Sequence, residues 1–200
     1  MLRRLIVILI AGVLAVGALL AYSSGLDVSF PGAAPATAPA APPVPVDPVT
    51  QPSGLPAAPS AAAEAAVVVR VVDGDTLVVD RGNGDERVRL VGVDTPETVA
   101  PNSPVECFGP EASAYVTGLL AGATVSLDPD PSQADADRYG RLLRYVWVAT
   151  DAGGWNSVEV MLLTGGFAEP YRDTHSRKAG FDALGADAMA AGRGLWGSCP

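Results

Sequence analysis

Histidine, cysteine and aromatic residues are scarce in this sequence of 200 residues. It contains 1 His, 2 Cys and 6% Phe, Trp and Tyr, and its 13 Lys and Arg are outnumbered by 22 Asp and Glu. Two cysteines make a poor zinc site. The net charge of −9 argues against tight binding of nucleic acid by phosphate neutralisation, because proteins that bind in that way are normally basic. The length fits one domain with extra segments, which excludes multidomain enzymes and repeat solenoids.

The composition divides the chain into three parts. Residues 1–22 form an apolar run behind two arginines and predict a signal peptide or a transmembrane anchor. Residues 23–66 are rich in Pro and Ala, with ten prolines between positions 31 and 66, which predicts a disordered linker. Residues 67–200 carry −8 of the net charge of −9 and are expected to form one folded domain. We therefore expect an exported chain, either secreted or anchored at the extracellular face of a membrane.

Both cysteines, Cys107 and Cys199, lie in the part that is expected to be exported. Outside the cytosol an even pair of cysteines usually forms a disulfide, so we predict a bridge between them. The bridge would remove the free thiol that a hydrolase built on Cys107 and His175 needs. His175 is the only histidine, and we expect no catalytic role for it.

The spacing of apolar residues in the folded part predicts five short strands and three helices. This pattern favours an α+β fold, a five-stranded OB-fold β-barrel that carries about three helices. A hydrophobic helix and the Pro/Ala-rich linker would precede the barrel. The predicted strands cover residues 67–72, 77–80, 87–91, 124–127 and 142–148, and the predicted helices cover 110–120, 157–166 and 176–191.

Four short segments contain the residues that could carry chemistry. Taken singly, each has a structural explanation: Asp-Gly is a common turn pair, Thr-Pro-Glu a good helix start and Tyr-Gly-Arg an ordinary turn. Taken together, they place carboxylates and guanidiniums at strand ends that can converge on one rim of a small barrel. The segments are Asp73-Gly74-Asp75-Thr76, residues 89–97 (RLVGVDTPE), Gly109-Pro110-Glu111-Ala112 and Asp137-Arg138-Tyr139-Gly140-Arg141.

This set of side chains suits the hydrolysis of a phosphodiester. A hard divalent cation held by oxygen ligands screens and polarises the phosphate. A carboxylate outside the inner shell of the metal can orient or deprotonate a water, and guanidiniums bind phosphate oxygens.

In their order and spacing the four segments resemble the thermonuclease family, the staphylococcal-nuclease-like calcium-dependent nucleases, from about Val67 to Trp196. The resemblance implies an endonuclease that hydrolyses DNA and RNA with little sequence specificity. It implies that Ca²⁺ is held by the carboxylates of Asp75 and Asp94 and by the backbone carbonyl of Thr95. The other implied roles are catalysis by Arg89, Glu97 and Arg141, with Glu97 as the general base, and substrate binding by Tyr139, Arg138 and Tyr171.

The chain departs from the family pattern in its binding residues. Residues 98–104 contain no lysine, and the stretch before Arg138 is acidic, so we expect low affinity for long nucleic acids. The three tryptophans are expected to pack rather than to stack on bases. Two other functions stay open: a catalytically weak or inactive OB-fold nucleic-acid-binding module displayed at the cell surface, and a tethered structural protein of the cell envelope. We expect a monomer.

Overall fold

A computed structural model describes residues 52–99 and 104–200. The predicted membrane or signal segment, residues 1–22, lies outside the described residues, as do residues 23–51 of the predicted linker. In the part of the chain that is described, no helix is long and apolar enough to cross a membrane. The first strand begins at Glu64, ahead of the boundary that the sequence placed at Val67.

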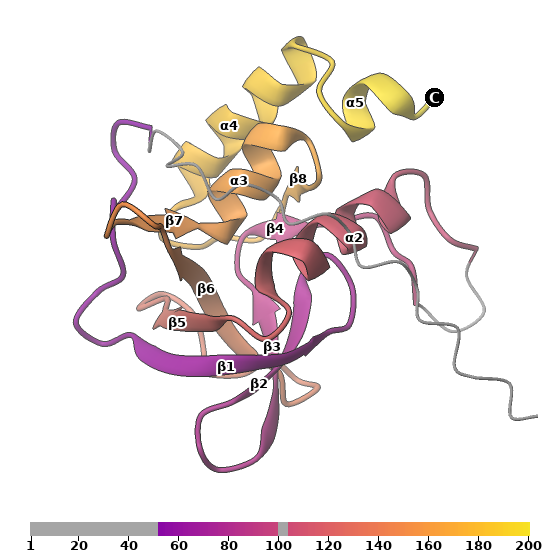
Figure 1. Cartoon of the computed structure of the whole chain (residues 1–200). Coiled ribbons are helices and arrows are strands. Elements are labelled where there is room, and N and C mark those ends of the chain that lie inside the picture. The colour runs from indigo at the N-terminus through magenta and orange to yellow at the C-terminus, as the bar shows by residue number, and fades with distance from the viewer. Residues whose placement is uncertain (1–51, 100–103) are drawn as a thin grey trace, which may run out of the picture. The chain divides into compact units, whose positions relative to one another are not determined.

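Short strands and four helices make up the described part of the chain (Figure 1). The strands are β1 (Glu64–Val71), β2 (Thr76–Asp80), β3 (Asp85–Leu90), β4 (Val93–Asp94), β5 (Thr124–Pro129), β6 (Leu142–Ala149), β7 (Trp155–Ser157) and β8 (Glu169–Pro170). The helices are α2 (Gly109–Leu120), α3 (Val158–Gly165), α4 (Lys178–Ala190) and α5 (Leu195–Ser198).

Five of the strands close into a barrel. They follow the order β3-β2-β1-β5-β6, and a parallel pairing between β3 and β6 closes the ring. Strand β7 extends the sheet beyond β6, and β4 pairs with β8 in a separate two-stranded sheet. The barrel and the three longer helices confirm the predicted α+β architecture and are consistent with an OB fold. In Figure 1 these helices gather on one side of the barrel, with α3 beside α4.

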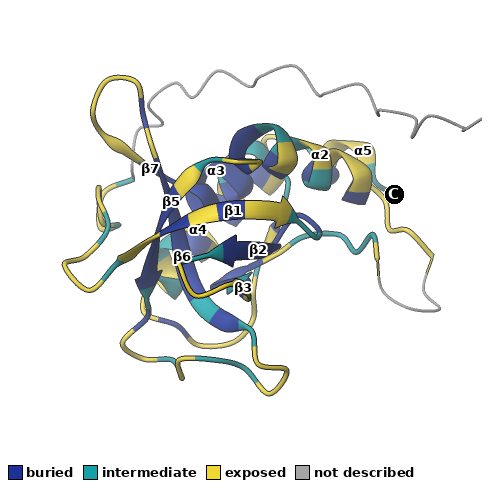
Figure 2. Ribbon diagram, turned by 60° about the horizontal axis from the view of Figure 1, so that its bottom comes forward, coloured by how far each residue is buried: buried dark blue, intermediate teal, exposed yellow. Residues whose placement is uncertain are grey.

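The core fills the barrel and continues beneath the helices. On β1 the burial alternates, with Ala66 and Val68 buried and Val67 exposed, as expected for a strand with one face on the core. Helix α2 carries both buried and exposed residues, whereas α3 is buried along Val158–Leu163 (Figure 2). From α4 the ring of Phe181 is completely buried and lies edge-on to Tyr145 of β6, 5.9 Å between centroids. This contact packs α4 against β6.

A buried polar network lies between β6 and the segment before α4. The Tyr145 hydroxyl donates to Asp130 Oδ2 at 2.7 Å and lies 3.0 Å from His175 Nδ1. His175 is only 6% exposed, and burial lowers its pKa.

Of the tryptophans expected to pack in the core, Trp147 is buried, whereas Trp155 is 36% exposed.

The predicted disulfide between Cys107 and Cys199 is confirmed. Their Cα atoms are 5.9 Å apart across a sequence separation of 92. The bridge ties Cys107, two residues before α2, to Cys199, the residue after α5. Elements β4, β7, β8 and α5 were not predicted, because each has only two to four residues and so carries no readable periodicity.

Candidate active site

The site begins at the bend between β1 and β2, where Asp73 and Asp75 are both buried. The Asp75 amide donates to Asp73 Oδ1 at 3.1 Å, and the Thr76 hydroxyl donates to Asp75 Oδ1 at 3.0 Å. Gly74 does not have a positive φ; it is needed for space, since a Cβ there would lie 2.7 Å from Thr95 Cγ2. The glycine thus lets the Asp75 bend and the Thr95 segment approach each other closely.

Arg89, near the end of β3, joins the acids of two separate segments. Its Nη1 lies 2.9 Å from Asp75 Oδ2, and its Nη2 lies 3.0 Å from Asp94 Oδ1. Nη1 also donates to the Val93 carbonyl at 2.9 Å. One guanidinium therefore bridges the two carboxylates that were predicted as metal ligands, which places both at the same end of the barrel.

The two-stranded sheet of β4 and β8 brings Tyr171 close to Arg89. Val93 pairs with Pro170, and Asp94 pairs with Glu169. The next residue, Tyr171, donates its amide to the Gly92 carbonyl at 3.0 Å. The Cζ atom of Arg89 lies 5.6 Å from the centre of the Tyr171 ring. Strands β4 and β8 thus place an aromatic ring beside the arginine.

No helix begins at the Thr95-Pro96-Glu97 segment. The Thr95 amide donates to Asp75 Oδ2 at 3.0 Å, which fixes this segment on the first bend. The Glu97 carboxylate is held through Oε1, which accepts hydrogen bonds from the amides of Thr98 at 2.9 Å and Val99 at 2.8 Å. Glu97 is therefore positioned by the backbone that follows it.

Arg141 reaches the site from the turn before β6. Its Nε lies 2.7 Å from Asp137 Oδ2, and its amide donates to Asp137 Oδ1 at 3.0 Å. Tyr139 in the same turn is 68% exposed, and the guanidiniums of Arg138 and Arg141 lie 4.8 and 5.5 Å from its ring centre. Asp137 therefore orients Arg141, while Arg138 and Tyr139 lie outside the lining of the two pockets described next.

These segments enclose a polar pocket of ≈ 300 Å³. All the residues predicted for metal binding or catalysis line it, together with one of the predicted substrate-binding residues. The lining consists of Asp73, Asp75, Thr76, Arg89, Asp94, Thr95, Glu97, Arg141 and Tyr171. The roles of these residues stay predictions, but the expected convergence on one rim is present.

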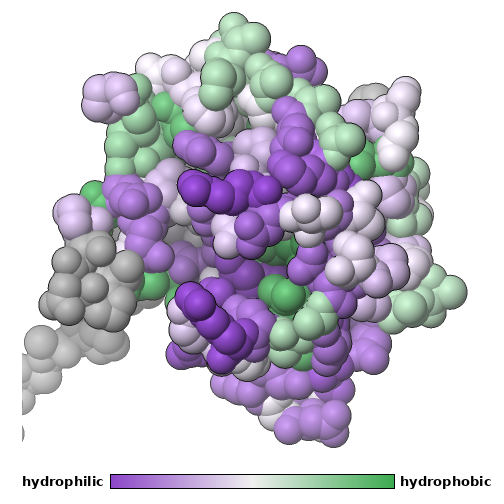
Figure 3. Space-filling view, turned by 180° about the vertical axis from the view of Figure 1, so that it is seen from behind, coloured by the Kyte–Doolittle hydropathy of each residue, from purple (hydrophilic) through white to green (hydrophobic). Residues whose placement is uncertain are grey.

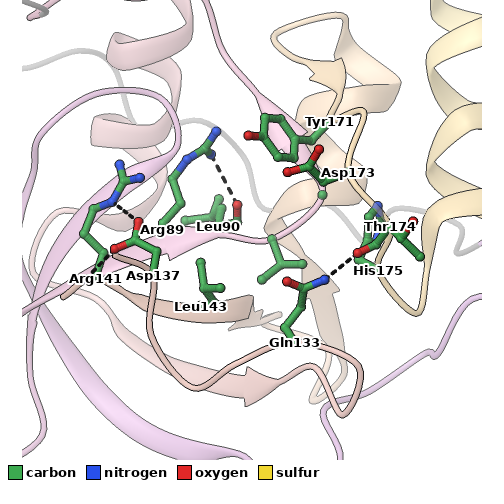
Figure 4. Close-up of a pocket in the computed structure, with 12 residues that line it drawn as sticks. Arg89, Leu90, Gln133, Asp137, Arg141, Leu143, Tyr171, Asp173, Thr174 and His175 are labelled. Atoms are coloured by element: carbon green, nitrogen blue, oxygen red, sulfur yellow. Dashed lines mark hydrogen bonds and ion pairs between the residues drawn. The ribbon is translucent and has the colours of Figure 1, made fainter. Parts of the chain in front are cut away.

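A second pocket, of ≈ 170 Å³, shares Arg89, Arg141 and Tyr171 with the first. Figure 4 shows it with Tyr171 and Asp173 on one side and Arg141 and Asp137 on the other. Leu90 and Leu143 give it an apolar wall. The pair of pockets therefore offers a charged compartment beside a partly apolar one. The face shown in Figure 3 is largely hydrophilic at its centre, with hydrophobic residues mostly toward its edges.

Negative charge is crowded in the first pocket. Burial, together with the charge of Asp75, raises the pKa of Asp73 to about 6. Burial also raises the pKa of Asp94, and the Arg89 guanidinium opposes this effect only in part. Two acids at the pockets were not assigned a role from the sequence. Asp73, in the first pocket, was interpreted as a turn residue. Asp137 lines the second pocket, and its spacing of four residues from Arg141 was the available signal.

The fold and the pocket define a barrel with an acid–arginine site at one rim, the arrangement that suits phosphodiester chemistry. The sequence profile of the family described as "Staphylococcal nuclease homologue" matches residues 87–198. Since this match covers more than half of the chain, the chain belongs to the staphylococcal nuclease homologue family.

Individual relatives agree with this assignment. The chain is 48% identical over 85 residues to the thermonuclease of Staphylococcus intermedius. The aligned residues are 42% of this chain and 49% of the relative. The chain is 46% identical over 84 residues to the thermonuclease of Staphylococcus hyicus, 42% of this chain and 48% of the relative. The chain thus spans about half the length of these curated relatives. It is also 34% identical over 135 residues to Protein ParB of Escherichia coli, 64% of this chain and 70% of the relative.

Proposed function

We propose that this chain is a Ca²⁺-dependent nuclease that hydrolyses phosphodiester bonds of DNA and RNA with little sequence specificity. The observation that carries the proposal is the single pocket in which Asp75, Asp94 and Glu97 meet Arg89 and Arg141. Membership of the staphylococcal nuclease homologue family supports it, as do the two relatives named thermonuclease.

The donor set fits a hard divalent cation. Asp75 and Asp94 both pair with the guanidinium of Arg89. Asp73, whose pKa is raised, lies beside Asp75. Three carboxyl groups therefore lie near one arginine. Within residues 52–99 and 104–200 no three His, Cys, Asp or Glu side chains are arranged to hold a metal. We propose, as the resemblance to the family implies, that a cation would use two carboxylates, Asp75 and Asp94, with the Thr95 carbonyl as a further ligand, and when bound it would screen and polarise a phosphate.

The remaining residues supply the other requirements of hydrolysis. Glu97 has one carboxylate oxygen fixed by backbone amides, and we propose that this carboxylate orients a water and accepts its proton. Arg89 and Arg141 are held in place by carboxylates, so their planar donors are preorganised for phosphate oxygens and for the charge that develops in the transition state.

The second pocket suits a nucleotide rather than a simple phosphate ester. Its wall of Leu90, Leu143 and Tyr171 can contact the flat face of a base while the phosphate lies beside Arg89 and Arg141. No base-specific set of donors is required for this contact, which agrees with low sequence specificity. Arg138 and the exposed Tyr139 would contact the nucleotide from the rim.

We also propose that the chain is exported, with residues 1–22 as a signal peptide or anchor, and acts as a monomer. The Cys107–Cys199 disulfide supports export, because such bonds persist in oxidising compartments. The alternative, a nucleic-acid-binding module without turnover, is favoured only by the acidic balance. A module of that kind has no need of Glu97 beside two aspartates.

The test uses the full chain with plasmid DNA and with RNA, in Ca²⁺ and in chelator. We expect cleavage of both substrates in Ca²⁺ and none in chelator, and a fall of roughly 100-fold or more in rate for Glu97→Gln. Glu111→Gln is the control, because Glu111 is exposed in the first turn of α2. Binding of DNA without cleavage would support the binding module instead.

Calcium binding is measured separately from activity. At a Ca²⁺ concentration 100 times Kd, a site in the native state adds about 2.7 kcal/mol of stability, so Ca²⁺ is expected to raise Tm. Asp75→Asn combined with Asp94→Asn is expected to abolish that increase. An equal Ca²⁺-dependent increase in this variant and in the unaltered chain would refute the proposed ligands.

A further inference from the structure

The segment that carries Glu97 is held from outside by Glu106. Oε2 of Glu106 accepts a hydrogen bond from the Glu97 amide at 2.9 Å, across a separation of nine residues. In return, the Glu106 amide donates to the Glu97 carbonyl at 2.9 Å. The backbone at Glu97 is thus bonded on both of its polar groups by one residue.

Gly109 shows how closely the two segments pack. A Cβ at Gly109 would lie 2.8 Å from Thr98 Cγ2, 3.0 Å from the Pro96 carbonyl oxygen and 3.1 Å from the Glu97 carbonyl oxygen. A side chain at this position would force Thr98 or the backbone of residues 96–97 to shift. Residues 96–98 therefore rest directly on the segment that leads into α2, and a shift of one segment displaces the other.

The segment that leads into α2 is itself attached to the helical side of the molecule. Cys107 follows Glu106 and is bonded to Cys199, directly after α5. Helix α5 is anchored in turn, because the Leu195 amide donates to the Gly166 carbonyl at 2.9 Å. The disulfide therefore connects the support of Glu97 to a fixed part of the fold.

We propose that Glu106 is a positioning residue for Glu97 and that the Cys107–Cys199 disulfide holds it in place, so that turnover depends on the oxidised bridge. The inference rests on the proposed function, which assigns Glu97 to the reaction. The Glu97 carboxylate is bonded to the amides of Thr98 and Val99, so it follows the backbone that Glu106 holds. A displacement of about 1 Å at a reacting group can cost roughly 100-fold in rate.

The bridge is open to a reductant in solution. Cys107 is exposed and Cys199 is half-buried. A dithiol breaks the bond between the two Sγ atoms, leaves each cysteine as a thiol with one added electron and proton, and is itself oxidised to a cyclic disulfide. Reduction therefore releases the support of Glu97 without touching the residues that line the pocket.

The first test compares Glu106→Ala with Glu106→Gln. Glutamine keeps an oxygen that can accept the Glu97 amide, so we expect its kcat to stay within twofold of the unaltered chain. Alanine removes the acceptor, and we expect kcat to fall roughly tenfold, a change of about 1.4 kcal/mol, with KM for DNA unchanged. Glu111→Gln is the matched control. An unchanged kcat in Glu106→Ala would overturn the proposal.

The second test addresses the bridge. We expect dithiothreitol to lower kcat of the unaltered chain at least tenfold, and Cys107→Ser with Cys199→Ser to be equally slow and insensitive to dithiothreitol. Tryptophan fluorescence, to which the buried Trp147 contributes, reports whether the barrel stays folded at the assay temperature. Glu106→Ala keeps the bridge, so it tests the positioning role even if the reduced chain unfolds. Full activity of the reduced, folded chain would refute the dependence on the bridge.

A third readout does not need activity. Hydrogen exchange at the Glu97 amide is expected to accelerate at least fivefold in Glu106→Ala and on reduction, and to stay unchanged in Glu106→Gln and Glu111→Gln. An unaltered chain that cleaves nothing would refute the proposed function. Unchanged exchange at Glu97 in Glu106→Ala would refute the positioning role, whatever the activity.

Discussion

Glu159 is a completely buried acid at the start of α3, and we expect its ionisation to destabilise the fold. Its Oε1 accepts a hydrogen bond from the Val146 amide at 2.7 Å, and its Oε2 accepts one from the Ser157 hydroxyl at 2.7 Å. Burial raises the pKa of Glu159 to about 7, although these hydrogen bonds favour the charged form. The substitution Glu159→Gln keeps the shape and removes the charge.

The sign and size of the effect follow from proton linkage. Because the folded-state pKa lies above the ordinary value of 4.5, the native state binds more protons than the unfolded state between pH 4.5 and about 7. Stability of the unaltered chain therefore falls as pH rises through this window and then stays constant. The shift corresponds to about 3 kcal/mol. Glutamine does not titrate, so the advantage of the variant is expected to grow by about 3 kcal/mol from pH 4.5 to pH 8.

The assay is urea unfolding of the two chains at pH 4.5, 6 and 8, followed by tryptophan fluorescence, with the disulfide intact. Glu111→Gln serves as an exposed control for the loss of one negative charge. If the difference in unfolding free energy between Glu159→Gln and the unaltered chain is the same at all three pH values, burial does not raise the pKa of Glu159 and the reasoning is refuted.

Two further predictions concern stability. Burial opposes ionisation of Asp130, but the hydrogen bonds that its carboxylate accepts outweigh burial and lower its pKa to about 2. Asp130→Asn is therefore expected to lower the free energy of unfolding in urea by about 2 kcal/mol at pH 6 and by little near pH 2. A loss of stability that does not change with pH would contradict this. Gly92→Ala is expected to cost roughly 3 kcal/mol by thermal unfolding, because its φ is 83° and a Cβ would lie 2.5 Å from His175 Cε1. Gly84→Ala, with φ 98° and open space, is the control, and an equal cost at both positions would exclude the clash.

The sequence was sufficient to predict the barrel strands and the long helices. The predicted strand at residues 77–80 matches β2 (Thr76–Asp80), and the predicted helix at residues 110–120 matches α2 (Gly109–Leu120). Valine-rich alternation and a proline at the first turn are local signals. The pairing of β4 with β8 has no such signal, because it joins Asp94 to Glu169 through packing that only the complete fold creates.

The acid and arginine positions were predictable as a set, but their pairing was not. Nothing in the spacing of Arg89 indicates that one guanidinium bridges Asp75 and Asp94. The sequence indicated that Gly74 is a turn glycine. In the structure a glycine is needed there because the Thr95 side chain approaches closely. Both features depend on the distance between the bend at residues 73–75 and the end of β4. Closure of the barrel sets that distance.

Contacts from side chains to backbone amides are the part of a site that sequence reasoning finds hardest to predict. The Thr95 amide binds Asp75, and the Glu97 amide binds Glu106, yet almost every residue carries an amide, so the identity of the donor contains no information. Conversely, Glu106 is exposed and lies next to a cysteine, and in sequence it resembles any surface acid. It follows that a motif search recovers Glu97, which touches the pocket, and passes over Glu106, which we propose fixes the position of Glu97 from behind.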